Sequence, residues 1–241
     1  MKNLLYILTA LLVLASCNKD DYFSDSGVHD PKFNGNMMQY LDSKGQKPQD
    51  PFDTLTQIIR YAGMEDNFKN DRLTFFAPPD PTIRKALNYL NVVLYLGGQD
   101  TIKSYQEVKP AVWKSILSEY MIKGDFGLND FRQVDTTALY AFSGQIFETY
   151  NETQPINVGA VYHDLNNNGV VIKYAGPRQI LLSYVPDYSR PTSSWVNTFV
   201  ASSNIQPTNG RVHVLNYNRH VFGFLYNRFA NLAIEYGIDY K

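Results

Sequence analysis

Hydrophobic residues recur at helical spacing through the first half of the chain. From Phe52 to Ala62, apolar side chains stand three or four positions apart, which predicts a helix that ends at Gly63. Apolar residues at helical spacing also follow Asp80-Pro81 and Pro110, and proline suits the first turn of a helix. The three predicted helices begin near Asp50-Pro51, Asp80-Pro81 and Pro110. We expect Asp80 to cap the helix that it begins, because a carboxylate accepts hydrogen bonds from free backbone amides.

The second half of the chain has a different pattern, with short β-prone runs separated by turn residues. Asn168-Gly169 and Asn209-Gly210 are strong turn signals among these runs, and residues 222–236 return to helical spacing. Strands are predicted over residues 72–77, 138–142, 145–150, 157–162, 169–174, 179–185 and 211–215. Helices that come early and strands that come late are typical of a single α+β domain.

The first sixteen residues fit neither pattern. Lys2 is followed by an apolar run over residues 4–15, interrupted only by Thr9. This run is too short to cross a hydrocarbon core, which needs about 20 residues, and it is typical of a removable secretory signal. We therefore predict three parts: a signal peptide over 1–16, a flexible tether over 17–35 and a folded domain over 36–241.

Cys17 is the only cysteine of the chain, so it cannot form an internal disulfide. Leu14-Ala15-Ser16-Cys17 resembles the lipobox of bacterial lipoproteins. The resemblance implies that Cys17 becomes the N-terminus and carries lipid, palmitate included, which would anchor the protein to the outer membrane without a spanning helix. An ordinary secretory signal with an unrelated cysteine is the alternative.

The residues directly after Cys17 are Asn18-Lys19-Asp20-Asp21. An acidic cluster at this place resembles the surface-export signal of lipoproteins in Bacteroidota. It implies that the protein faces outward from the outer membrane. The alternative is a solvated linker, because short acidic tracts are common in linkers.

Two stretches within the folded part resemble the paired signatures of fasciclin domains. Residues 73–80 read LTFFAPPD and residues 209–216 read NGRVHVLN, in the family's order and about 135 positions apart. Tyr120 matches the tyrosine of a Tyr-His pair that the family carries between them, whereas Met121 replaces the histidine. The resemblance implies a single fasciclin-like α+β domain, with helices packed on a β-sandwich or wedge of short strands, and a role in adhesion or binding rather than catalysis.

Composition narrows the classes of partner. The formal net charge of −1 gives no electrostatic reason to expect nucleic acid. Aromatic residues make up 14% of the chain, and most aromatics in a folded domain belong to its core. Trp195, with Tyr184 and Tyr188 close before it, lies in a polar, loop-like segment. These three residues are the candidate ligand-binding group, since they could stack on a sugar ring; the alternative is that they anchor the loop to its own domain.

Two other features of the sequence could suggest a metal or catalytic site: a calcium-like motif and His213. Asp164-Leu165-Asn166-Asn167-Asn168-Gly169 resembles the start of a calcium loop, but Ala175 stands where a bidentate glutamate is needed. We favour a hairpin turn there. His213 lies between two valines and is expected to be a structural residue rather than a base or a metal ligand. We predict no cofactor, no metal and no catalytic residue.

Three functions remain open. The first is a lipid-anchored surface protein that binds extracellular protein or glycan. The second is an accessory subunit of an outer-membrane TonB-dependent complex for glycan uptake. The third and least favoured is an enzyme that acts on carbohydrate, because no pair of carboxylates stands out in the sequence.

Overall fold

The structure is a computed structural model, and it describes residues 31–152, 154–187, 189 and 194–240. Residues from Pro31 onward make up one unit of the chain. Cys17, the predicted signal peptide and most of the predicted tether lie outside the described residues, as does Tyr188.

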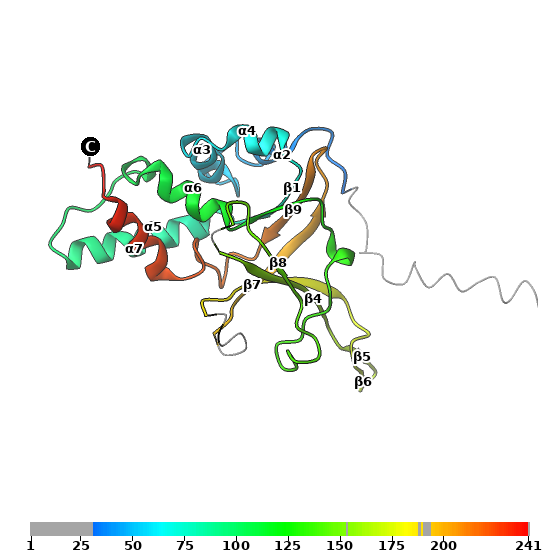
Figure 1. Ribbon diagram of the computed structural model, residues 1–241. Helices are drawn as coiled ribbons and strands as arrows, with labels where there is room; N and C mark the ends of the chain where they lie inside the picture. The colour runs from blue at the N-terminus through cyan, green and yellow to red at the C-terminus, as the bar shows by residue number, and fades with distance from the viewer. Residues whose placement is uncertain (1–30, 153, 188, 190–193, 241) are drawn as a thin grey trace, which may run out of the picture. The chain divides into compact units, whose positions relative to one another are not determined.

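Six α-helices lie in the described residues, and Figure 1 shows them gathered beside the sheet. They are α2 (Met37–Ser43), α3 (Asp53–Tyr61), α4 (Glu65–Asn70), α5 (Asp80–Leu96), α6 (Pro110–Ser118) and α7 (Tyr226–Tyr236). Two short 3₁₀ helices, η2 (Tyr105–Glu107) and η3 (Leu128–Asp130), lie in the connections. Helix α5 packs against α7 and α3, while α6 contacts α3, α7 and the edge of the sheet.

The main sheet has seven strands in the order β2-β1-β9-β8-β7-β4-β3. Their bounds are β1 (Leu73–Ala77), β2 (Met121–Lys123), β3 (Gln145–Phe147), β4 (Ile156–Tyr162), β7 (Arg178–Tyr184), β8 (Val196–Ile205) and β9 (Gly210–Leu215). Only β1 and β9 run parallel; every other neighbouring pair is antiparallel. The two stretches with family-like signatures therefore lie side by side as β1 and β9.

Strand β1 lies within the apolar run from which a strand is predicted over residues 72–77. All five of its residues are buried, because β1 lies between β2 and β9 and is covered on both faces. The helices predicted from apolar spacing are likewise confirmed as α3, α5 and α6, with Leu55, Ile58 and Ile59 of α3 facing the core. The predicted α+β class is confirmed.

One predicted strand is absent, and one strand of the structure was not predicted. Residues 138–142 form successive turns instead of a strand, and Tyr140 is 95% exposed. The side chain of Asp135 accepts hydrogen bonds from both the amide and the hydroxyl of Thr137, which favours a turn over an extended backbone. Conversely, no strand is predicted over residues 196–205, where β8 runs for 10 residues.

The predicted hairpin around Asn168-Gly169 is present, but its first strand is not the one predicted over residues 157–162. It joins β5 (Leu165–Asn167) to β6 (Val170–Ile172), which form a separate two-stranded sheet below the main one in Figure 1. Asn168 and Gly169 both have positive φ, +50° and +88°, as a tight hairpin turn requires. β4 pairs with β7 instead of β6, so the hairpin is an insertion between two neighbouring strands.

Residues 31–35, which the sequence assigns to the predicted tether, form hydrogen bonds with the turn that precedes β9. The amide of Phe33 donates to the carbonyl of Gln206 at 2.9 Å, and the amide of Gln206 donates to the carbonyl of Pro31 at 2.7 Å. The amide of Thr208 donates to the carbonyl of Gly35 at 2.9 Å. Residues 31–35, the N-terminal segment from here on, therefore lie against the turn that leads into β9.

Candidate functional site

Two of the three aromatic residues proposed from sequence, Tyr184 and Trp195, lie in the described part of the chain, and their surroundings differ. Tyr184, at the end of β7, is only 7% exposed; its ring stacks on that of Phe224, with 5.2 Å between the centroids. The guanidinium carbon of Arg228 lies 4.8 Å from the Tyr184 centroid. Trp195 directly precedes β8 and is partly exposed, and its buried indole Nε1 has no hydrogen-bond partner among the described residues. Ligand stacking by this group stays a prediction, with Trp195 as its accessible member.

His213 on β9 is fully buried and fully hydrogen-bonded. Its Nδ1 accepts from the amide of Asn204 at 3.2 Å, and its Nε2 donates to the carbonyl of Phe126 at 2.9 Å. Its ring also stacks on Phe76, with 5.4 Å between centroids. Burial lowers the pKa of His213 to about 4, so the imidazole is neutral at pH 7. The structural role expected for it fits this environment.

Tyr120 is also buried, and it forms a hydrogen bond with His220, a contact that the sequence did not predict. The Tyr120 hydroxyl lies 2.9 Å from Nε2 of His220, and it accepts a hydrogen bond from the amide of Gly223 at 2.8 Å. On the other side of the imidazole, Nδ1 lies 2.9 Å from the Thr198 hydroxyl. We assign the Tyr120 proton to the bond with Nε2, because the tyrosine oxygen already accepts from Gly223; Nδ1 then donates to Thr198.

This buried hydrogen-bond network links distant parts of the chain. Burial lowers the pKa of His220 to about 3 and raises the pKa of Tyr120, so both groups are neutral near pH 7. Met121 occupies the place of the family's histidine and is itself buried. His220 comes from one hundred positions further along, and only the folded chain brings it to Tyr120. The seven-residue spacing between His213 and His220 matches no known ligand pair, so the sequence did not indicate a role for His220.

A buried ion pair lies beside this network. Glu119 is 1% exposed, and its carboxylate accepts two hydrogen bonds from the guanidinium of Arg228 on α7. Burial raises the pKa of Glu119, while Arg228 opposes this shift. This ion pair connects the end of α6 to α7. The Arg228 guanidinium also packs over the ring of Tyr184. Neither group lines the open pocket described below.

The described residues contain no group of three or more His, Cys, Asp or Glu side chains placed to hold a metal ion. Asp164, the first residue of the calcium-like motif, accepts a hydrogen bond from the amide of Tyr174 at 3.0 Å and pairs with Lys173. The Asn166 side chain accepts from the amide of Gly169 at 2.9 Å. These contacts close the hairpin, so they account for the residues that resemble a calcium loop.

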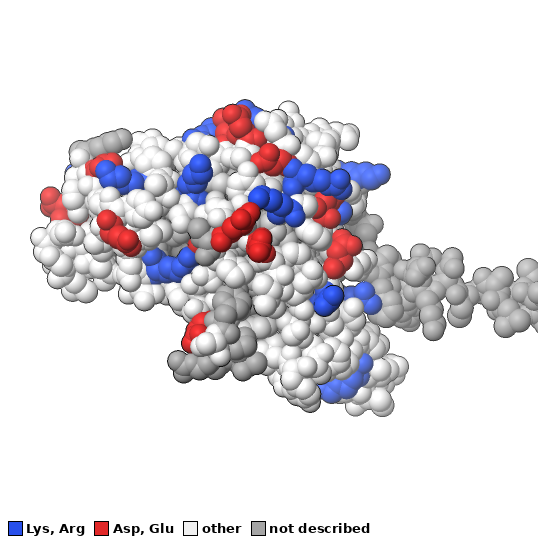
Figure 2. Space-filling view, viewed as in Figure 1, with Lys and Arg blue, Asp and Glu red and all other residues white. Residues whose placement is uncertain are grey.

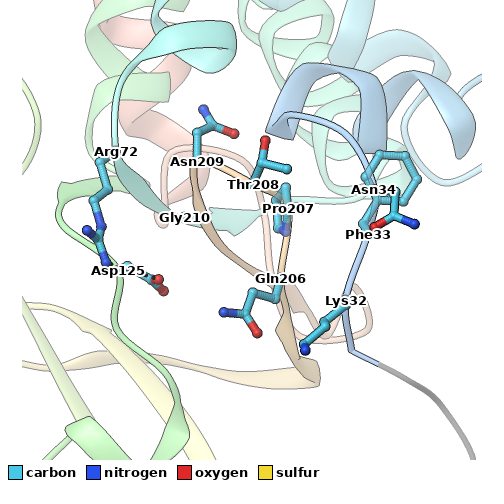
Figure 3. A pocket seen from close by; sticks show the side chains of 10 residues that line it. All are labelled: Lys32, Phe33, Asn34, Arg72, Asp125, Gln206, Pro207, Thr208, Asn209 and Gly210. Carbon is cyan, nitrogen blue, oxygen red and sulfur yellow. Dashed lines mark ion pairs between the residues drawn. The ribbon is translucent and has the colours of Figure 1, made fainter.

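An open pocket of about 510 Å³ lies where the N-terminal segment meets the turn between β8 and β9. Figure 3 shows it from close by, with Arg72 and Asp125 on one side and Phe33 and Asn34 on the other. Its lining residues are Lys32, Phe33, Asn34, Arg72, Asp125, Gln206, Pro207, Thr208, Asn209 and Gly210. Most of these residues carry side chains that can donate or accept hydrogen bonds, so the pocket suits a polar ligand.

Asn209 and Gly210 fix the rear wall of this pocket. The Asn209 side chain donates to the carbonyls of Phe68 and Asp71, at 3.0 and 2.9 Å, and accepts from the amide of Met37 at 2.7 Å. Gly210 has φ +144°, and a Cβ placed on it would lie 1.8 Å from the carbonyl oxygen of Leu73. The second signature thus positions the pocket by joining α2, α4 and β1.

Asp125 is held by two arginines at the pocket. Nε of Arg211 lies 2.8 Å from Oδ1, and a terminal nitrogen of Arg72 lies 3.5 Å from Oδ2. The Asp125 and Arg211 side chains are largely buried, whereas that of Arg72 is 75% exposed. The carboxylate therefore has a fixed orientation, and the Arg72 guanidinium keeps donors for another group.

Figure 2 shows Lys and Arg interspersed with Asp and Glu on the face in view, without one large patch of either sign. Such a surface does not favour a long polyanion such as nucleic acid. None of the helices in the described ranges combines the length and the apolar character that crossing a bilayer requires.

Comparisons with known proteins identify a family. The sequence profile of the fasciclin domain matches residues 50–217. Among solved structures, a FAS1 domain pair from the insect cell adhesion molecule fasciclin I is similar, with 13% identity, a TM-score of 0.43 and coverage of 76% of this chain. The match covers 50% of that structure, so this chain spans half its length. A search of curated proteins found no match.

Proposed function

This chain belongs to the fasciclin domain family, and we propose that it is a lipid-anchored binding protein of the outer cell surface. The family match over residues 50–217 carries the proposal, because fasciclin domains are commonly modules of cell adhesion. The ligand is an extracellular protein or a glycan. Lipid on Cys17 holds the protein to the outer membrane, and the acids after Cys17 direct it outward.

A binding role, and no enzymatic one, fits the chemistry of the described residues. The two buried histidines, His213 and His220, are neutral and have both ring nitrogens in contact with fixed partners. A general base needs access to a substrate proton, which these positions do not give. Polar groups line the open pocket beside the N-terminal segment, where a ligand can enter without any rearrangement of the core.

Fractionation of cells tests the anchor. The wild-type chain should sediment with outer membranes and leave them only in detergent, whereas Cys17→Ala should be released in soluble form. Ser24→Ala, a change in the predicted tether, serves as the matched control and should behave as the wild type. Membrane attachment of Cys17→Ala, together with an unlipidated wild-type cysteine in mass spectrometry, would show the anchor proposal to be wrong.

Adhesion tests the ligand-binding half. Cells that display the protein should attach to immobilised extracellular protein or polysaccharide better than cells that lack it. Attachment equal to that of cells without the protein, over a broad panel of both classes, would contradict a binding role.

The alternative is an accessory subunit of a TonB-dependent glycan transporter. The hairpin β5–β6 favours a protein partner, because Val170, Val171 and Ile172 are all exposed on it and exposed apolar patches often mark protein contacts. Purification from detergent-solubilised membranes should then recover one TonB-dependent transporter in a fixed ratio, and Val171→Lys should weaken its recovery. Recovery of the protein without a transporter favours the adhesion role.

A further inference from the structure

We propose that the pocket between the N-terminal segment and the β8–β9 turn binds an anionic saccharide. The ligand carries a carboxylate, sulfate or phosphate group beside the hydroxyls of a sugar ring. This inference rests on the proposed binding function and names its site and its ligand class. It differs from the earlier expectation that the segment around Trp195 binds glycan.

The charge around the pocket favours an anion. The charged residues of the lining are two basic ones, Lys32 and Arg72, and one acidic one, Asp125. Arg211, beside the lining, already pairs with Asp125 at 2.8 Å, so the carboxylate has a partner other than Arg72. Arg72 is the residue placed to meet the anion, because its side chain is 75% exposed and its contact with Asp125 is long. A guanidinium can bind a carboxylate, sulfate or phosphate group through two parallel hydrogen bonds.

The uncharged lining residues suit sugar hydroxyls. The side chains of Asn34, Gln206 and Thr208 form no hydrogen bond with the described residues, so their amide and hydroxyl groups remain available. Each of these groups can both donate and accept, as a sugar hydroxyl also can. Asp125 adds a carboxylate whose orientation is fixed by Arg211. A simple inorganic anion would leave most of these groups unused.

The shape of the pocket is set before a ligand arrives. Backbone hydrogen bonds of 2.7 to 2.9 Å hold the N-terminal segment against residues 206–208, and Asn209 ties the turn to α2 and α4. Phe33 gives one wall an apolar surface, and its ring packs edge-on against Tyr40. A volume of about 510 Å³ lies within the usual range of small-molecule sites, about 300–1,000 Å³. A fixed wall lowers the entropy that binding costs.

Calorimetry on the full-length chain in detergent tests the proposal. The probes are trigalacturonic acid, a sulfated carrageenan oligosaccharide, neutral maltotriose and sodium sulfate. At least one of the two acidic oligosaccharides should bind with a saturable isotherm, and maltotriose and sulfate should bind far more weakly. Arg72→Ala should weaken the affinity roughly tenfold to a hundredfold, as expected for loss of a charged hydrogen-bonding group, and Gln206→Ala should weaken it by a smaller factor.

Arg84→Ala is the matched control, because Arg84 is an exposed arginine on α5 and does not line the pocket. It should bind as the wild type does. Hydrogen–deuterium exchange should show protection of residues 206–211 when the acidic sugar is added, so the site is located without relying on a variant that could misfold.

Three results would overturn the inference: neither acidic oligosaccharide binds; sulfate alone binds as tightly as the acidic sugars; or Arg72→Ala binds as tightly as Arg84→Ala. If one of these occurs while cells displaying the protein still attach to an extracellular ligand, only the site assignment fails. If attachment is lost as well, the proposed binding function fails with it.

Discussion

Asp80 caps a helix that begins twenty-seven residues before it. Its Oδ2 lies 2.7 Å from the amide nitrogen of Thr54, and its Oδ1 lies 3.0 Å from the amide nitrogen of Leu55, both in the first turn of α3. The sequence predicts that Asp80 caps α5, the helix that it begins, but α5 has no side-chain cap. The carboxylate instead binds free amides of a neighbouring helix, and so fixes α3 against the end of β1.

Removal of this carboxylate should destabilise the domain. Asp80 is almost fully buried, so Asp80→Ala leaves two amides of α3 without an acceptor. We expect a loss of about 2 kcal/mol in the free energy of unfolding, measured by urea denaturation. Asp80→Asn keeps one acceptor oxygen and should lose less. Asp66→Ala, an exposed acid in the first turn of α4, should change stability by under about 0.5 kcal/mol; equal losses at both positions would refute the capping role.

Gly210 should tolerate no side chain. A Cβ at this position would lie 1.8 Å from the Leu73 carbonyl oxygen, so alanine must force β9 away from β1. Gly210→Ala is expected to abolish soluble, cooperatively folding protein. Gly169→Ala separates the clash from backbone strain, since Gly169 also has positive φ but a Cβ placed on it would meet no atom within 4 Å. It should cost about 1 kcal/mol, and a folded Gly210→Ala of similar stability would contradict the close approach.

Glu119 and Arg228 should show strong coupling in a double-mutant cycle. Either single alanine variant leaves a poorly solvated charge beside Tyr184, and each should lose about 3 kcal/mol or more in unfolding free energy. The double variant Glu119→Ala with Arg228→Ala should lose less than the sum of the two. Chemical denaturation of all four proteins gives the coupling energy. Additive losses would mean that the two groups act independently.

Stability should fall as the pH drops below 6.5. The pKa values of His213 and His220 are lowered to about 4 and about 3 by burial, so the unfolded chain binds protons at a higher pH than the folded one. Their contribution is therefore complete above pH 6.5 and decreases as the pH falls towards 4. At pH 5 each histidine should cost about 2 kcal/mol relative to pH 7, if it stays neutral in the folded state.

Urea midpoints at several pH values measure this dependence. Asp80 and Glu119, whose pKa values are raised by burial, act in the opposite direction, so a comparison of variants is needed. His213→Gln should flatten the dependence of the midpoint on pH between pH 7 and pH 5 relative to the wild type. A His213→Gln midpoint that changes between pH 7 and pH 5 as much as the wild-type midpoint does would contradict the buried neutral histidine.

The sequence predicted those elements whose stability comes from local pattern. The apolar stripe of α3, the buried run of β1 and the Asn168-Gly169 turn each depend on residues within a few positions of one another. Strand β8 escaped prediction because its pairing with β7 and β9, and not its composition, makes it a strand. The strand predicted over 138–142 is absent for the opposite reason. Its composition favours a strand, but no neighbouring strand among the described residues pairs with it.

The candidate site was less predictable than the fold. Asn209 and Gly210 could be singled out as a turn, but the bonds of Asn209 to Phe68 and Met37 required the folded chain. The partnership of Tyr120 with His220 crosses one hundred positions, and the pocket requires the N-terminal segment, which the sequence assigned to a tether. Contacts of this range follow from topology, which a single sequence specifies only through the whole fold.

Labelling of intact cells tests the central claim most directly. A membrane-impermeant reagent that modifies lysine should label the wild-type protein on living cells as fully as after the outer membrane is permeabilised, because the proposed function places the domain outside, on lipid attached to Cys17. In Cys17→Ala cells, the cell-bound labelled protein should be absent. Labelling of the wild-type protein only after permeabilisation would contradict the account, since a domain that faces inward cannot bind an extracellular ligand.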